Sequence, residues 1–162
     1  MANIKFGKAY TTYMGVLIKV LITSRGDVLE LGAGPISTPL LHWVCKDMNR
    51  SLTSFENDLE FFNLARQYQS NIHRIRFVTN WNEVDTKTHR GLVFIDHAPP
   101  IRRSIDTIRF KDSADYIVIH DTDQEKHYGF DKVWPHFKYI YTWKESRPWV
   151  SVVSNFKDLS KL

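Results

Sequence analysis

The chain alternates between short apolar runs and segments in which apolar side chains recur at helical spacing. The first helical segment, residues 8–24, has its apolar positions at Tyr10, Tyr13, Met14, Leu17, Ile18, Leu21 and Ile22. Further helices are predicted at residues 38–48, 59–68, 101–108 and 129–136. Apolar runs between them predict strands at residues 28–31, 50–55, 75–78, 91–95, 116–119, 139–143 and 149–154.

This order of elements predicts an α/β fold, in which the first five strands alternate with helices and form a parallel sheet covered on both faces. Only Lys144–Pro148 separates the last two strands, whereas a parallel crossover needs about a dozen residues. These two strands are therefore expected to pair as an antiparallel hairpin at the end of the sheet. The 162 residues, 43% of them hydrophobic, suffice for one domain with its own core.

The segment Asp27–Thr38 connects the first predicted strand to the next helix through a glycine turn. Gly32 and Gly34 adopt backbone angles closed to other residues and let a ligand approach the main chain. Ser37 or Thr38 is expected to cap the helix that follows. A strand, a glycine turn and a helix at the start of an alternating α/β chain are typical of a nucleotide-binding site.

The pattern Glu30-x-Gly32-x-Gly34 resembles motif I of the class I S-adenosylmethionine-dependent methyltransferases, and the seven expected strands resemble the Rossmann-like sheet of that family. The resemblance implies that Gly32, Ala33 and Gly34, aided by Glu30, receive the methionine part of the cofactor. Ser37 stands where the dinucleotide fingerprint of dehydrogenases has its third glycine, which disfavours a dehydrogenase.

Four further residues are expected to contact the cofactor: Glu56, Asn57, Asn80 and Trp81. Glu56 ends the second strand, 22 residues after Gly34, where an acid of a Rossmann-like site binds the ribose hydroxyls. Asn57 lies beside it, and either Asn57 or Asp58 is expected to cap the next helix. The resemblance implies that Asn80 and Trp81, after the third strand, lie beside the adenine, although a core position for the tryptophan is an equally good interpretation.

The acceptor is expected beside the residues that follow the fourth and fifth strands, namely Asp96, His97, His120 and Asp121. Asp96 is also placed among the cofactor-binding residues. In one scheme, Asp96 and Asp121 hold Mg²⁺, as acids at these places do in metal-dependent O-methyltransferases. In the other, His97 or His120 removes a proton from the acceptor while Asp96 or Asp121 orients its ring. The histidines depart from the metal-dependent pattern, and both schemes stay open.

The segment Ala98-Pro99-Pro100-Ile101 resembles the loop of amino-methyltransferases that act on nucleic-acid bases, but Ala98 and Ile101 lack the side chains which that chemistry uses. We therefore expect an oxygen of a small molecule as the acceptor. Nucleic acid or protein is the alternative, favoured by the pI of about 9.2, and a non-catalytic cofactor-binding protein is a further one. Arg102 and Arg103, on the helix that follows, are expected to be solvated.

Composition limits the remaining possibilities. The single cysteine, Cys45, allows no internal disulfide and is expected to be a buried helix thiol, which suits a reducing cytoplasm. No apolar run approaches the roughly 20 residues that span a bilayer, so we expect a soluble, cytoplasmic protein without a secretory signal. His42, His73, His89, His127 and His136 are expected to be structural or exposed.

Overall fold

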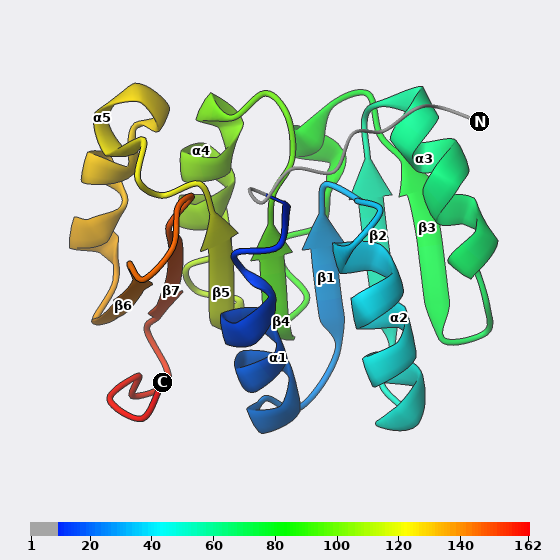
Figure 1. Cartoon of the computed structure of the whole chain (residues 1–162), viewed down its shortest axis with the longest axis horizontal. Helices are drawn as coiled ribbons and strands as arrows, with labels where there is room; N and C mark the ends of the chain where they lie inside the picture. The colour runs from blue at the N-terminus through cyan, green and yellow to red at the C-terminus, as the bar shows by residue number, and fades with distance from the viewer. Residues whose placement is uncertain (1–9) are drawn as a thin grey trace.

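The computed structural model describes residues 10–162, which form one seven-stranded sheet with helices on both faces (Figure 1). The strands are β1 (Val28–Leu31), β2 (Leu52–Glu56), β3 (His73–Phe77), β4 (Arg90–Ile95), β5 (Ala114–His120), β6 (Tyr139–Trp143) and β7 (Val150–Ser154). The helices are α1 (Met14–Thr23), α2 (Ser37–Asp47), α3 (Leu59–Ala65), α4 (Ile101–Arg109) and α5 (Glu125–Tyr128). Short 3₁₀ turns cover Arg66–Tyr68, Trp81–Glu83, Phe130–Lys132 and Trp134–His136.

The strand order is β3-β2-β1-β4-β5-β7-β6. Strands β1 to β5 are parallel, and β7 pairs antiparallel with both β5 and β6. The predicted parallel sheet with a terminal antiparallel hairpin is therefore confirmed. No helix among residues 10–162 is long and apolar enough to cross a membrane.

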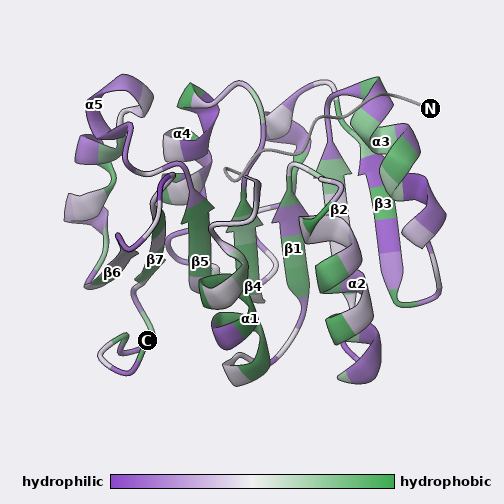
Figure 2. Ribbon diagram, in the orientation of Figure 1, coloured by the Kyte–Doolittle hydropathy of each residue, from purple (hydrophilic) through white to green (hydrophobic). Residues whose placement is uncertain are grey.

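Alternation along the strands divides the core into two layers. Leu92, Phe94 and Val118 face α1 and α2, whereas Val93 and Ile95 face the opposite layer, which includes the end of α4. Figure 2 shows the resulting apolar character of the central strands β1, β4 and β5. Because both faces are covered, these strands are apolar at nearly every position, and the polar residues of the sheet collect where the strands end.

Three local predictions need correction. A helix was expected at residues 129–136, but α5 ends at Gly129, whose φ is +75°, and two 3₁₀ turns follow, the second containing Pro135. The first helix begins at Met14; residues 8 and 9 of its predicted range lie outside the described residues. No side chain caps α2, because its N-cap residue is Ile36, which has no polar side chain, and Ser37 and Thr38 lie within the helix. The Thr38 hydroxyl bonds to Glu30 and to the Gly34 amide.

Candidate functional site

The carboxyl ends of four parallel strands lie side by side along one side of the sheet, which we call the carboxyl edge. Leu31 of β1 pairs with Phe55 of β2 and with Ile95 of β4, and Ile95 pairs with Ile119 of β5. The residues that come next in each strand or loop therefore form a row along this edge, at the top of Figure 1: Glu56, Gly32, Asp96 and His120. In open parallel sheets this edge is where ligands bind.

Gly32 lies where the loop after β1 touches the loop after β4. Its φ is +93°, and a Cβ at this position would lie 2.6 Å from the carbonyl carbon of Asp96 and from the amide nitrogen of His97. The glycine is thus required by close contact between two backbones, a reason that the motif alone did not reveal.

Glu30 lies beneath this loop and is fully buried. Its carboxyl oxygens accept hydrogen bonds from the Thr38 hydroxyl, at 3.0 and 3.1 Å, and from the Ser54 hydroxyl. The Thr38 hydroxyl also accepts the Gly34 amide at 2.9 Å. Burial raises the pKa of Glu30 to about 7. Glu30 therefore braces the glycine loop from inside rather than facing the open edge.

A chain of buried polar groups continues from Glu30 across the sheet. Ser54 Oγ lies 2.8 Å from His73 Nε2, and His73 Nδ1 lies 3.1 Å from His42 Nδ1. Burial lowers the pKa of His42, and lowers that of His73 to about 4, so both rings are neutral near pH 7. Since the Ser54 hydroxyl donates to Glu30, His73 must donate through Nε2 and accept at Nδ1 from His42.

Glu56 stands at the end of β2, directly against the glycine loop. Its Oε1 accepts the backbone amides of Asn57 and Asp58 at 2.8 and 2.7 Å. The amide of Ala33, in the glycine loop, also interacts electrostatically with the carboxylate. Burial raises the pKa of Glu56, and these amides oppose the rise. Asn57 Oδ1 is buried and finds no hydrogen-bond partner within residues 10–162. Asp58, not Asn57, caps α3 through the amides of Glu60 and Phe61.

The two residues expected beside the adenine have different surroundings. Asn80 is exposed, and its side chain accepts the amide of Asn82 at 3.0 Å. Trp81 is only 5% exposed, and its indole nitrogen donates to the carbonyl of Ala98 at 2.9 Å. The structure thus places Trp81 in the core, which agrees with the second of the two interpretations.

His97 lies inside the protein, behind the edge. It is 1% exposed, and its Nε2 lies 2.8 Å from the carboxylate of Asp106. The ring packs on Trp81 with 4.2 Å between centroids. Burial lowers the pKa of His97, against the influence of Asp106. This environment separates His97 from the other residues expected around the acceptor.

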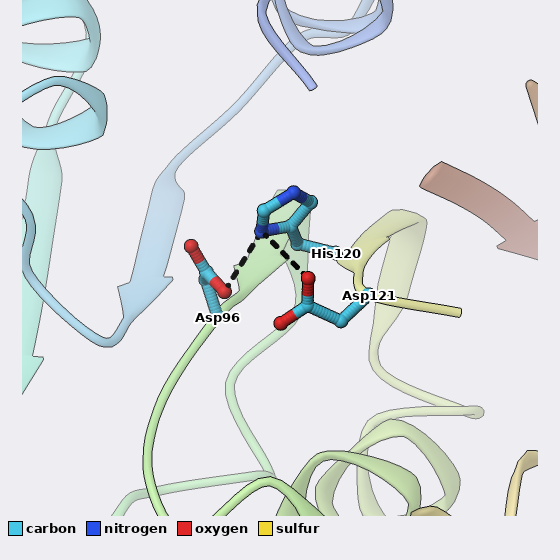
Figure 3. A group of neighbouring side chains, drawn as sticks. All are labelled: Asp96, His120 and Asp121. Atoms are coloured by element: carbon cyan, nitrogen blue, oxygen red, sulfur yellow. Dashed lines mark hydrogen bonds and ion pairs between the residues drawn. The ribbon is translucent and has the colours of Figure 1, made fainter. Parts of the chain in front are cut away.

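Asp96, His120 and Asp121 come together at the ends of β4 and β5 (Figure 3). His120 Nδ1 lies 3.1 Å from Asp96 Oδ1 and 3.7 Å from Asp121 Oδ1. On the other side of the ring, Nε2 lies 3.0 Å from the hydroxyl of Thr12, just before α1. Asp121 holds a φ of +60°, which turns its carboxylate toward the cluster.

Arg103 joins the two carboxylates, contrary to the expectation that it is solvated. Its guanidinium pairs with Asp96 Oδ1 at 3.1 Å and with Asp121 Oδ2, and its Nε donates to the carbonyl of His97 at 2.9 Å. Only 8% of the side chain is exposed. It lies on the inward face of α4 with Thr107, whereas the apolar Ile101 and Ile105 are exposed. The apolar spacing of this helix therefore gave no signal that Arg103 is buried.

The predicted magnesium site does not fit these contacts. One ligand atom from each of Asp96, His120 and Asp121 lies within 4.8 Å of the others, which is close enough for an ion. However, the positive charge that would balance the two carboxylates is already supplied by Arg103. The third donor is an imidazole nitrogen, whereas Mg²⁺ prefers oxygen. No chemical step is therefore assigned to a metal.

No family model matches this sequence, and no curated protein sequence does either. Solved structures do resemble it. A methyltransferase from Pyrococcus furiosus has a TM-score of 0.60 and 20% identity over 96% of this chain and 89% of that chain. A protein assigned as a caffeoyl-CoA O-methyltransferase from Staphylococcus aureus has a TM-score of 0.66 and 12% identity over 93% of this chain and 84% of that chain.

The N-terminal domain of human METTL16, in complex with SAH, has a TM-score of 0.62 and 13% identity over 95% of this chain and 73% of that chain. The catalytic domain of the same human protein, in complex with the MAT2A 3′UTR hairpin 1, has a TM-score of 0.64 and 11% identity over 96% of this chain and 72% of that chain. This chain therefore has the fold of the class I S-adenosylmethionine-dependent methyltransferases.

Proposed function

We propose that this protein is an S-adenosylmethionine-dependent methyltransferase. The observation that carries the proposal is the carboxylate of Glu56, which stands at the end of β2 beside the glycine loop, where the amide of Gly32 donates to the carbonyl of Phe55 at 2.9 Å. The amide of Ala33 in this loop also lowers the pKa of Glu56. The polar groups at this place suit the cofactor. The loop of Gly32, Ala33 and Gly34 would receive the methionine part, and Glu56 would accept hydrogen bonds from the ribose hydroxyls. Asn57 Oδ1, which lacks a partner within residues 10–162, offers a further acceptor.

When bound, the cofactor supplies a methyl group on a positively charged sulfur. The chain's own task is then to position the acceptor and to take its proton. Because Asp96 accepts the Nδ1 proton of His120, the free lone pair of His120 lies on Nε2, toward Thr12. An acceptor hydroxyl that takes the place of the Thr12 hydroxyl would lose its proton to Nε2 as its oxygen gains the methyl group. Arg103 pairs with the carboxylate of Asp96 at 3.1 Å and holds it in place.

Two classes of acceptor are compatible with this chemistry, a small molecule with a reactive oxygen and a nucleic acid. The structural neighbours include both a protein assigned as an O-methyltransferase and one bound to an RNA hairpin. Nothing in the cluster of Asp96, His120 and Asp121 distinguishes the two, so the distinction must come from the surface around it.

Calorimetric titration with S-adenosylmethionine and with SAH tests the proposal. We expect both to bind the wild-type protein, and Glu56→Gln to weaken both by roughly tenfold or more, since a hydrogen bond to a charged group is lost. Glu145→Gln, on the exposed turn between β6 and β7, is the matched control. Failure of both ligands to bind wild type would overturn the proposal.

Transfer from methyl-labelled cofactor to a panel of hydroxylated small molecules and RNA then separates an enzyme from a non-catalytic binder. His120→Asn should keep cofactor affinity and lose turnover, because it removes the proton acceptor and leaves the glycine loop intact. Cofactor binding without transfer to any member of the panel would favour the non-catalytic alternative.

A further inference from the structure

A groove of about 910 Å³ runs between α1 and the edge strand β6. We call it the α1–β6 groove. Its walls are the residues just before α1 and the first turns of that helix, the outer end of β6, the turn that joins β6 to β7, and Leu162. The polar and aromatic residues that line it include Thr12, Lys19, Tyr141, Trp143 and Arg147.

The groove exists because α1 covers the middle of the sheet and not its edge. Tyr141 pairs with Val152 of β7, which pairs with Val118 of β5, so these side chains share one face. Val118 and Val152 are buried against the helix α1 in the core, whereas Tyr141 is only partly buried at its margin. The aromatic side chains of β6 therefore lie beside α1 and are not covered by it.

Tyr141 and Trp143 occupy alternate positions of the strand and lie on this face. Alternate residues of a strand are about 6.7 Å apart. Trp143 is 37% exposed and therefore offers part of its ring to a ligand. Aromatic rings spaced along an exposed strand form a stacking platform for successive bases of a single-stranded nucleic acid.

The charged residues of the groove are both cationic. Lys19 lies on the α1 side and Arg147 on the turn after β6, and none of the described residues that line the groove is acidic. The formal net charge of the whole chain is +4. Two cations flanking a pair of aromatic rings match a ligand that carries both planar bases and phosphates.

The groove also reaches the cluster at the ends of β4 and β5. Thr12 lines the groove, and its hydroxyl is the one that contacts His120 Nε2 at 3.0 Å. Trp143 pairs with Val150, which in turn pairs with His120, so Trp143 and His120 are two strands apart in one row. This separation is about 10 Å, close to the size of one nucleotide.

We propose that the α1–β6 groove binds single-stranded nucleic acid, with bases on Tyr141 and Trp143 and phosphates at Lys19 and Arg147. A nucleotide beyond Trp143 then lies beside His120. The binding of nucleic acid goes beyond the proposed function. That the bound nucleic acid is also the methyl acceptor rests on the proposed function.

Fluorescence anisotropy with a labelled oligouridylate of 12 nucleotides, in the absence of cofactor, tests binding. We expect Trp143→Ala to weaken binding roughly tenfold or more, and Trp143→Phe to restore most of it, because stacking needs a ring and not an indole. The double variant Lys19→Gln, Arg147→Gln should weaken binding and reduce the dependence on log salt by about 1.4, since each phosphate contact contributes about 0.7.

Trp43→Ala is the matched control for the aromatic variant, because Trp43 is 58% exposed on α2, outside the groove. Arg76→Gln with Lys87→Gln controls for charge, as both residues are exposed elsewhere. All variants should keep the thermal transition of wild type, and the double variant Lys19→Gln, Arg147→Gln provides the test should Trp143→Ala not fold.

Three results would overturn the proposal: no binding of the oligonucleotide by wild type, unchanged affinity for it in both Trp143→Ala and the double variant, or competition by uridine monophosphate as strong as by the oligonucleotide. The last would indicate a site for one nucleotide. Because this assay contains no cofactor, its failure is distinguishable from failure of cofactor binding in the calorimetric titration.

Discussion

Arg103 balances the charge of the site. Its guanidinium contacts two carboxylates and the carbonyls of His97 and His120, so one side chain positions the ends of both β4 and β5. A lysine at this position would not make all of these contacts, because they depend on the several N–H donors of the planar guanidinium group.

Replacement of Arg103 should therefore be costly. We expect Arg103→Ala to lower the free energy of unfolding by about 3 kcal/mol, since it leaves two partly buried carboxylates without their counter-charge. Arg103→Lys should restore less than half of this loss. Urea denaturation measures both, with Arg76→Ala, on an exposed strand position, as a control within about 0.5 kcal/mol of wild type. Similar stability of the alanine and lysine variants would show that charge is irrelevant here.

Glu30 makes the stability of the protein depend on pH. Burial raises its pKa from 4.5 to about 7, so the folded protein binds a proton that the unfolded chain releases. Its contribution is fully present below pH 4.5 and is lost as the pH rises through 7. His73 has the opposite effect, because burial lowers its pKa from 6.5 to about 4 and stability is lost as the pH falls.

Comparison with Glu30→Gln separates these two effects. The unfolding free energy of the variant minus that of wild type should increase between pH 4.5 and 7, by on the order of 3 kcal/mol, because only wild type carries the penalty of ionising this buried acid. Chemical denaturation at several pH values measures it, with Glu83→Gln on an exposed turn as control. A difference that does not vary with pH would show that Glu30 titrates normally.

At the scale of elements, the loop after β1 and the loop after β4 are in direct backbone contact, although they are far apart in the sequence. The loop after β1 has no room for a side chain at Gly32, because the backbone of Asp96 and His97 fills that space. The loop that would receive the cofactor and the loop that carries Asp96 therefore cannot move independently.

Gly32→Ala should disrupt both loops. The added methyl group would lie 2.6 Å from two backbone atoms, in a φ region that alanine avoids, so we expect a loss of about 3 kcal/mol or more of stability and loss of SAH binding. Gly15→Ala is the matched control, because no atom lies within 4 Å of a Cβ there. In helix α1 that change should stabilise the protein by up to about 1 kcal/mol. Denaturation and calorimetry measure both effects.

Helices and strands could be predicted from the sequence where the spacing of apolar residues was clear. β1, β4 and β5 contain apolar runs, whereas β2 and β3 alternate and were identified by their place between helices. The short connection Lys144–Pro148 determined the final hairpin. Residues 129–136 were not predictable as 3₁₀ turns, because Phe130, Val133 and Phe137 bury themselves at nearly helical spacing whether the backbone is α-helical or not.

For the whole molecule, the sequence indicated which residues collect at one edge but not which way each side chain turns. Asp96 and His97 are neighbours, yet one reaches His120 and the other Asp106. Arg102 and Arg103 are also neighbours with different partners, since Arg102 bonds to Asp106 and Arg103 pairs with Asp96 and Asp121. These directions depend on tertiary packing, and the α1–β6 groove depends on how far α1 extends across the sheet; neither is encoded in local periodicity.

Ligands that bind only the folded molecule raise its thermal transition temperature. We expect SAH at a hundred times its dissociation constant to raise that temperature by several degrees, since the stabilisation is about 2.7 kcal/mol. Millimolar MgCl₂, with or without a chelator, should leave it unchanged because Arg103 already neutralises the carboxylates. Calorimetric scanning measures both; stabilisation by Mg²⁺ that a chelator reverses would restore the metal scheme.

The buried chain from His42 through His73 and Ser54 to Glu30 has a polarity: each group donates toward Glu30. Reversing one link leaves two donors or two acceptors facing each other, so the four side chains can change only as a set. Substitutions among them should therefore be strongly coupled, with a double variant costing much less than its two single variants added together. The four residues under the glycine loop thus act as one energetic unit, although they come from β1, α2, β2 and β3.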